Sequence, residues 1–160
     1  MITLEKITED NFEECLSLSV TEKQKEFIAS NAYSLCEAYA LTNHKFYIPL
    51  PLAIYDNHKM VGFTFIVYQP IDKDNPLDDE DVYYLARIMI DKKYQGNGYG
   101  KLALKKIIEY IKTFPCGKAK AIILSSNPNN ERAYSLFKSI GFKEMGMTDD
   151  DSDNLLRLDL

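Results

Sequence analysis

The sequence predicts an α/β fold in which one mixed sheet carries helices, and three observations indicate it. Segments of strand length alternate apolar and polar residues or form short apolar runs, while longer segments repeat apolar residues every three or four positions. Their order is strand, two helices, three strands, helix, strand, helix and two strands. No repeat, linker or low-complexity tail interrupts the chain, so we expect one domain over residues 1–160.

The first half of the chain supplies a strand, two helices and a pair of strands. Residues 2–7 alternate as a strand does, and residues 8–18 predict a helix start followed by a short amphipathic stretch. Residues 21–24 fit a capping box and open a second predicted helix. The apolar face of that helix comprises Phe27, Ile28, Ala32, Leu35, Cys36 and Tyr39. Residues 50–55 and 61–68 predict paired strands around a turn-rich link.

The middle of the chain combines a buried strand with the strongest helix pattern. A polar, proline-containing loop over residues 69–81 leads into an apolar strand over residues 82–90. Residues 101–114 then predict an amphipathic helix, which the segment 115–117 stops because it contains proline and glycine. The residues that share its apolar face are Ala103, Ile107, Ile108 and Ile111.

The last third of the chain predicts a strand, a helix and two final strands. Residues 119–125 form another apolar run. The dipeptide 127–128 predicts a helix start, because asparagine suits an N-cap and proline suits the first turn; Gly141 suits the C-terminal end. The apolar face of this helix comprises Ala133, Leu136, Phe137 and Ile140. Residues 142–147 and 155–160 predict the final strands.

Composition excludes several classes of protein. A formal net charge of −5 argues against a general nucleic-acid binder and is compatible with a cationic substrate. There is no signal-peptide core and no apolar run of membrane-spanning length. The three cysteines match no zinc spacing, which suggests reduced thiols in a cytoplasm, and the two histidines are isolated. We expect a cytoplasmic protein with no metal, nucleic-acid or membrane partner.

The glycine loop after the strand 82–90 is the most informative segment. Gly96, Gly98 and Gly100 lie directly before a predicted helix. This spacing lets the backbone turn sharply and exposes amide N–H groups at a helix N-terminus, where the helix dipole and Lys101 favour a phosphorylated ligand. The spacing fits neither the G-x-G-x-x-G dinucleotide loop, whose third glycine would be Lys101, nor the G-x-x-x-x-G-K-[ST] P-loop.

Two motifs resemble those of one enzyme family. Gln95-x-x-Gly98-x-Gly100 resembles the acyl-CoA pyrophosphate loop of the GNAT N-acetyltransferases. The segment 130–142 is similar to their second signature, N-x-x-A-x-x-x-Y-x-x-x-G-F, and the order of strands and helices matches the family over the full length. Gln24-x-x-Phe27, the segment 61–63 and the compact length make the chain look most like small bacterial spermine/spermidine-type acetyltransferases.

The resemblance implies a mixed, mostly antiparallel sheet whose central strands splay apart, with acetyl-CoA as the co-substrate in the gap and no metal. The pantetheine arm would pair with the strand backbone at Ile88, Met89 and Ile90. The residues implied at the pyrophosphate are Gln95, Gly96, Asn97, Gly98, Tyr99, Gly100 and Lys101. The cofactor-binding residues implied on the following helix are Asn130, Ala133 and Phe137.

The resemblance also implies direct attack of a small molecule's primary amine on the thioester, with polyamines such as spermine or spermidine first. Holding the acetyl carbonyl beside a neutral amine supplies much of the catalysis, up to roughly 7–11 kcal/mol for well-oriented reactants. Strand amides can polarise the carbonyl as an oxyanion site does. The alternatives are an aminoglycoside, amino-acid or protein N-terminal acceptor, or a CoA-binding protein with weak catalysis. Dimers are frequent among similar proteins, so a homodimer is one expectation.

The general acid is one departure from the family pattern. The family often places tyrosine, as acid to the leaving thiolate, where this chain has Phe137. Tyr134 lies three residues earlier on a neighbouring part of the same helix surface and is the candidate catalytic residue, with packing or CoA contact as the alternative. Tyr83, Tyr84 and Tyr94 are expected to pack.

The general base is the other departure. Polyamine acetyltransferases often carry an acidic residue just before the position of Arg87, and this chain has Ala86 there. The amine can lose its proton instead through water held by the backbone or by another acid; the candidate acids, which the sequence does not rank, are Glu22, Glu26, Glu37 and Glu80. The acidic run 78–81 either attracts a polyamine or is a solvated loop, and the run 149–153 is expected to be a charged hairpin.

Overall fold

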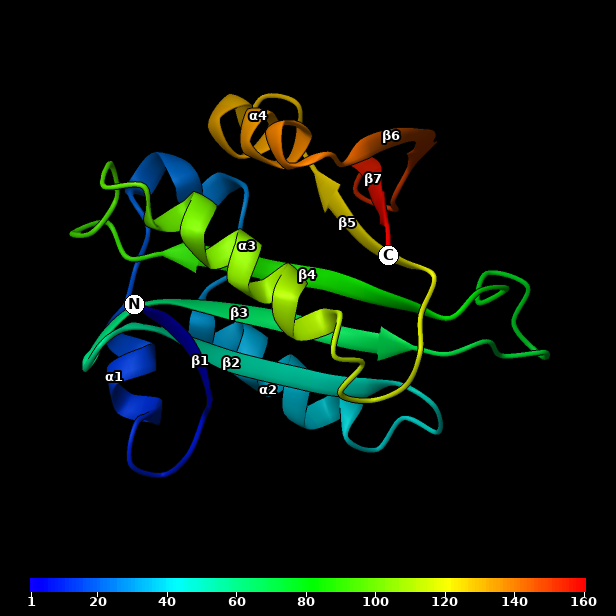
Figure 1. Cartoon of the computed structure of the whole chain (residues 1–160), viewed down its shortest axis with the longest axis horizontal. Helices are drawn as coiled ribbons and strands as arrows, with labels where there is room; N and C mark the ends of the chain where they lie inside the picture. The colour runs from blue at the N-terminus through cyan, green and yellow to red at the C-terminus, as the bar shows by residue number, and fades with distance from the viewer.

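The computed structural model, which describes residues 1–160, contains one seven-stranded sheet with helices on both faces (Figure 1). The strands are β1 Ile2–Lys6, β2 Ile48–Asp56, β3 Lys59–Gln69, β4 Val82–Ile90, β5 Ala121–Ser126, β6 Lys143–Thr148 and β7 Asn154–Asp159. The helices are α1 Phe12–Ser17, the 3₁₀ helix η1 Glu22–Glu26, α2 Asn31–Leu41, α3 Tyr99–Ile111 and α4 Glu131–Ile140. The strand order is β1-β2-β3-β4-β5-β7-β6, and only β4 and β5 are parallel. The predicted mixed, mostly antiparallel sheet is confirmed.

The sheet opens between β4 and β5. These strands share three residue pairs, the last of which joins Tyr84 to Ile123. Beyond that pair β4 continues to Ile90 beside β3 alone, and β5 continues to Ser126 beside β7 alone. Figure 1 shows β5 turning away from β4, so the splayed central strands are confirmed.

The helices divide between the two faces of the sheet. Because successive side chains of a strand point to opposite faces, each strand contributes to two cores. Tyr83 and Leu85 pack into the larger core with α3 and α4, which defines the α3 face. Phe65 and Met89 pack into the second core with α1 and α2, which defines the α2 face. In Figure 1, α3 crosses in front of the sheet and α2 lies behind it.

Strong periodicity predicted α3 and β4 well. β4 has the predicted bounds, and α3 begins two residues earlier than predicted, at Tyr99. The predicted apolar face of α3 is buried, at Ala103, Ile107, Ile108 and Ile111. The helix ends at Ile111, before the proline that was expected to stop it. No helix of the structure combines the length and the apolarity needed to cross a bilayer.

The second predicted helix is two helices. The capping box that Thr21 and Gln24 form is present, but it opens only the short η1. The chain leaves the helical path after Phe27, and α2 starts afresh after Ser30, whose hydroxyl accepts a hydrogen bond from the Tyr33 amide at 3.1 Å. A second N-cap therefore explains the break.

The predicted apolar face of that helix is confirmed only in part, at Ile28 and Leu35, which pack against the second core. Side chains that were expected to be buried are exposed at Ala32, Cys36 and Tyr39. The buried residues of α2 are Asn31, Ser34 and Ala38. The Asn31 amide donates to the Cys15 carbonyl at 2.9 Å, and the Ser34 hydroxyl donates to the Ser30 carbonyl at 3.0 Å. These polar side chains are buried because their hydrogen bonds are satisfied inside the protein.

The predicted start of α4 is also wrong. Asn130 is the N-cap and the helix begins at Glu131. Asn127 instead shapes the preceding turn, because its side chain accepts from the Asn129 amide at 2.9 Å and its carbonyl accepts from the Asn130 amide at 2.9 Å. Gly141 ends α4 as predicted, with a φ of 115°.

Candidate active site

The loop between β4 and α3 presents a row of backbone N–H groups that have no acceptor in the chain. From Gln95 to Lys101, no amide donates to a protein atom; the first amide of α3 to do so is that of Leu102, to the Gly98 carbonyl at 3.2 Å. Gly96 and Gly98 have φ values of 85° and 80°, and a Cβ at either position would meet no atom within 4 Å. Such a row of free donors at a helix N-terminus is suited to an anion.

Buried contacts to the segment after α1 hold the start of this loop. The Asp91 side chain is buried and accepts hydrogen bonds from the Ser19 amide at 2.8 Å and the Lys93 amide at 2.9 Å. The Lys92 amide returns a bond to the Ser19 carbonyl at 2.8 Å. The loop is therefore fixed before any ligand binds.

Gln95 and Gln24 form a reciprocal pair of side-chain hydrogen bonds. The Nε2 of Gln24 donates to Gln95 at 3.0 Å, and the Nε2 of Gln95 donates to Gln24 at 2.9 Å and to the Ile90 carbonyl at 2.9 Å. The Gln95 side chain thus turns into the protein, which leaves its backbone amide as the group that faces outward from the loop. Sequence reasoning singled out both residues but did not predict that they meet.

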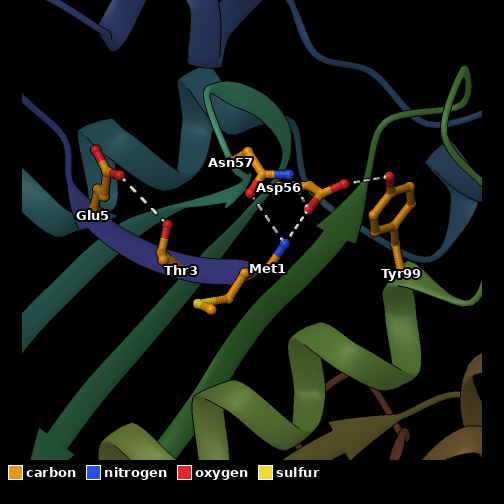
Figure 2. A network of polar contacts seen from close by, with 6 residues as sticks. All are labelled: Met1, Thr3, Glu5, Asp56, Asn57 and Tyr99. Carbon is orange, nitrogen blue, oxygen red and sulfur yellow. Dashed lines mark hydrogen bonds and ion pairs between the residues drawn. The ribbon is translucent and has the colours of Figure 1, made fainter.

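The Tyr99 side chain also turns away from the amide row. Its hydroxyl donates to Asp56 at 2.8 Å, and the same carboxylate accepts from the Met1 amino group at 2.6 Å (Figure 2). Hydrogen bonds from the Met1 amino group and from Tyr99 hold the pKa of Asp56 below its usual range. The β2–β3 hairpin is thereby joined to the first residue of α3, so the Tyr99 side chain positions the helix.

Other predicted cofactor residues lie on α3 and α4 or at their starts. Lys101 is exposed and its ammonium forms no ion pair. A Cβ on Gly100 would lie 3.5 Å from Leu136, so the start of α3 and the middle of α4 are neighbours. The Asn130 side chain forms no hydrogen bond within the chain, and Ala133 is half-buried.

Phe137 and Tyr134 do not present their side chains to the opening. Phe137 is 7% exposed, and its ring packs against Phe142 with centroids 6.0 Å apart. The Tyr134 hydroxyl donates to Glu144 and accepts from the Asn154 amide at 3.0 Å. These partners belong to β6 and β7, on the far side of β5 from β4. The structure does not bring the predicted catalytic tyrosine to the gap.

Polar side chains meet on the α2 face where the two strands part. The Tyr84 hydroxyl donates to the Ser125 hydroxyl at 2.9 Å and so connects β4 with β5. A register shift in the pairing of β4 with β3 leaves Ala86 without a partner. The adjacent Arg87 donates to Glu37 of α2 at 2.8 Å. These groups lie on the α2 face, beside the point where β4 and β5 separate.

Carboxylates of the β6–β7 loop lie close enough to Tyr84 to raise its pKa. Asp149 accepts from the Asp151 amide at 3.0 Å and the Asp153 amide at 2.8 Å, which folds the loop. Burial raises the pKa of Asp153, and its neighbour Asp149 raises it further. Both carboxylates act on the pKa of Tyr84, so the expected charged hairpin contributes negative charge beside the opening.

The four candidate bases are mostly committed to ion pairs. Glu22, Glu37 and Glu80 each pair with a lysine or arginine, while Glu26 pairs with none. Glu37 contacts β4, where it neutralises Arg87. No group of three or more histidine, cysteine, aspartate or glutamate side chains in the structure could hold a metal ion.

The acidic run 78–81 shapes its own loop. Asp78 is 8% exposed and accepts the Tyr47 hydroxyl at 2.8 and 2.9 Å. Asp81 accepts from the Ile71 amide at 2.9 Å. The loop leads into the Val82 end of β4, whereas the amide row follows the Ile90 end. The structure therefore fits neither a solvated loop nor substrate contact: three of the four acidic side chains form hydrogen bonds or an ion pair within the protein.

Comparison with known proteins identifies the family. Residues 5–142 match the acetyltransferase (GNAT) family. The chain belongs to the GNAT family. A spermine/spermidine N(1)-acetyltransferase of Bacillus subtilis (strain 168) is 32% identical over 149 residues, which cover 92% of this chain and 91% of that protein. A probable spermine N(1)-acetyltransferase of Bacillus subtilis subsp. natto matches with the same identity and coverage.

Solved GNAT structures have the same fold. The aminoglycoside acetyltransferase AAC(6')-Ib in complex with coenzyme A superposes with a TM-score of 0.77 at 16% identity, covering 99% of this chain and 95% of that one. A spermidine N-acetyltransferase from Vibrio cholerae in complex with CoA and spermine gives 0.67 at 14% identity, with 99% and 94% covered. At these identities the likeness concerns the fold.

This GNAT protein is an N-acetyltransferase, and acetyl-CoA is its acyl donor. The spacing of the glycines pointed to the loop 95–101, whose amides have no acceptor in the chain. Sequence reasoning missed Asp91, Ser125 and the role of Gln24, since each acts through a partner far away in the sequence. The only sign of these side chains in the sequence is that each is a polar residue near apolar ones, which does not reveal its partner.

Proposed function

We propose that this GNAT enzyme transfers acetyl from acetyl-CoA to a primary amine of spermine or spermidine. The observation that carries the proposal is the 32% identity, over 92% of the chain, with a spermine/spermidine N(1)-acetyltransferase. The net charge of −5 and the carboxylates of Asp149 and Asp153 beside the opening favour a polycation. Arg87 would repel an ammonium group, but Glu37 neutralises it.

In this proposal the pyrophosphate of the donor binds the amide row from Gln95 to Lys101. The free N–H groups, the N-terminus of α3 and the unpaired Lys101 ammonium all favour negative charge there. Gly96 and Gly98 leave the approach to the backbone unobstructed. The side chains of Gln95 and Tyr99 keep the loop in place and do not contact phosphate.

The pantetheine arm would lie in the gap between β4 and β5. The edge of β4 that faces the gap has no strand partner over residues 85–90, so the backbone at Ile88, Met89 and Ile90 can pair with the arm's amides. Asn130 and Ala133 would line the other side. The neutral amine then attacks the acetyl carbon from the α2 face, the C–N bond forms, the C–S bond breaks, and the nitrogen loses its proton.

We also propose that residues 1–160 act as one acetyltransferase domain, since a single sheet joins the first strand to the last. A homodimer stays a prediction, which light scattering coupled to size exclusion measures directly.

A panel of amines tests the acceptor. Spermine, spermidine, an aminoglycoside, a free amino acid and a short peptide are each offered with saturating acetyl-CoA, and release of the CoA thiol is followed. We expect kcat/KM to be highest for the polyamines. A clear preference for the peptide or the aminoglycoside would reassign the acceptor, and absence of turnover with every amine would overturn the proposal.

A further inference from the structure

Acetyl transfer needs a proton path that the family position does not provide here. The attacking nitrogen loses a proton and the departing sulfur gains one. Phe137 has no hydroxyl, and the Tyr134 hydroxyl is bonded to Glu144 and Asn154 over β6 and β7. Either solvent or another group near the point where β4 and β5 separate must therefore carry the proton.

Tyr84 stands at that point. Tyr84 and Ile123 form the last backbone pair of β4 and β5. Ser125 lies two residues further along β5, so strand alternation places it on the same face as Ile123. The 2.9 Å hydrogen bond from the Tyr84 hydroxyl to Ser125 therefore links the strands just past their last pair, on the α2 face.

The bonded pair has one free hydrogen. The Ser125 oxygen accepts the Tyr84 proton, and the Ser125 hydroxyl donates to no other atom of the chain. Half of the other tyrosine hydroxyls donate to acceptors elsewhere. Those that donate to distant acceptors belong to Tyr47, Tyr68, Tyr83, Tyr99 and Tyr134. The Tyr84–Ser125 pair is thus a two-hydroxyl chain with an unoccupied donor at the opening.

The surroundings keep the phenol of Tyr84 protonated. Burial is the largest effect and raises its pKa; the hydrogen bond to Ser125 lowers it, and the weaker effects of Asp149 and Asp153, which raise it, and of Arg87, which lowers it, come after. A phenol with a raised pKa gives up its proton poorly when it acts alone. In a relay it gains one proton as it loses another, so it does not have to become a phenolate. The geometry is therefore suited to a relay rather than to a lone acid.

We propose that Tyr84 and Ser125 are the proton relay of this enzyme, an inference that rests on the proposed acetyl transfer. As the amine nitrogen bonds to the acetyl carbon and the C–S bond breaks, Ser125 gives its hydroxyl proton to the sulfur. Tyr84 gives its proton to the Ser125 oxygen and takes one from the nitrogen. One proton moves from nitrogen to sulfur, and both hydroxyls are restored.

Three variants test the relay. Tyr84→Phe and Ser125→Ala should each lower kcat by about 100-fold, within the range of general acid–base catalysis. Both should keep the calorimetric Kd for acetyl-CoA, since neither side chain belongs to the amide row. Ser125→Thr retains a hydroxyl and should recover most of the turnover. Tyr39→Phe, at a tyrosine that is 76% exposed, is the matched control and should behave as the wild type.

A merely structural role would not reproduce the full pattern. The double variant of Tyr84→Phe with Ser125→Ala should be no slower than either single variant, because one path is interrupted once. The solvent deuterium isotope effect on kcat should fall in both single variants relative to the wild type. Thermal melting of each variant identifies any variant that is unfolded. If Tyr84→Phe is unfolded, the result for Ser125→Ala decides the test.

Two results would overturn the relay. One is a kcat for Tyr84→Phe or Ser125→Ala within about threefold of the wild type, too little for proton-transfer catalysis. The other is a larger loss for Tyr134→Phe than for Tyr84→Phe. Wild-type turnover with each amine, recorded in the same assay, reports on the proposed function separately. The relay is judged with whichever amine the wild type acetylates.

Discussion

Replacing Gly100 with alanine separates ligand contact from the stability of the fold. Gly100 lies in the first turn of α3, and an added Cβ would lie 3.5 Å from Leu136, which is an ordinary contact. Alanine in place of glycine inside a helix stabilises it by about 0.5–1 kcal/mol. We therefore expect the free variant to melt at the same temperature as the wild type or slightly higher.

Binding should change in the opposite direction. The added methyl lies in the amide row that we propose for the pyrophosphate, where the backbone must approach the phosphate closely. Loss of one hydrogen bond to a charged group costs about 1.5–3 kcal/mol. Since about 1.4 kcal/mol is a tenfold change, the Kd for acetyl-CoA should rise by about 10- to 100-fold.

Calorimetry with acetyl-CoA and a melting curve without ligand measure both effects. Gly98→Ala is the matched variant: nothing lies within 4 Å of its Cβ, but its φ of 80° makes alanine cost about 1–2 kcal/mol, so this variant should lose stability as well. A wild-type Kd in a stably folded Gly100→Ala variant would show that the phosphates lie elsewhere.

Four further predictions follow from the same structure. Acetyl-CoA at 100 times Kd should stabilise the fold by about 2.7 kcal/mol, or about 5–10 °C in a thermal-shift series, and no shift at millimolar ligand would contradict donor binding. Turnover of spermine should fall as salt rises, because charges are screened beyond about 8 Å at physiological ionic strength; a salt-independent kcat/KM argues against electrostatic capture. Tyr134→Phe should lower kcat by less than about tenfold, since its hydroxyl is bonded to Glu144, and steady-state kinetics decide this. The hydrogen bond from Arg157 lowers the pKa of Glu80, so the stability that this pair contributes is present above the unfolded-state pKa of Glu80 and is lost as the pH falls. Glu80→Gln should therefore reduce the free energy of unfolding more at pH 7 than at pH 3. Equal reductions at the two pH values, measured by urea unfolding, would contradict this.

The local sequence pattern predicted correctly those elements in which apolar side chains are buried and polar side chains are exposed. β4 is a continuous apolar run, and α3 has one apolar face, so both were found with accurate bounds or nearly so. α2 breaks the rule, because Asn31 and Ser34 are buried with satisfied hydrogen bonds while Tyr39 is exposed. A pattern of apolar residues cannot reveal a polar side chain whose partner lies on another element.

The same limit applies to the site. The glycine loop is readable because spacing within a few residues determines which amides are free. Gln24 and Gln95 are 71 residues apart, and Tyr84 and Ser125 are 41 apart, so no local pattern joins them. The choice of Tyr134 as a substitute acid assumed that neighbours on a helix surface face the same site. The structure instead turns that hydroxyl toward β6 and β7.

The opening of the sheet explains why these distant bonds exist. Past Tyr84, β4 has a strand on only one side, and a strand edge without a partner is poorly supported. Bonds from Ser19 and Gln24 hold the loop that follows β4, and so restrain the end of the strand without filling the gap. The backbone groups that face the gap then remain free to pair with a ligand. A neighbouring strand would support the end of β4 but would also close the gap. The hydrogen bonds that hold the loop after β4 therefore come from residues far away in the sequence.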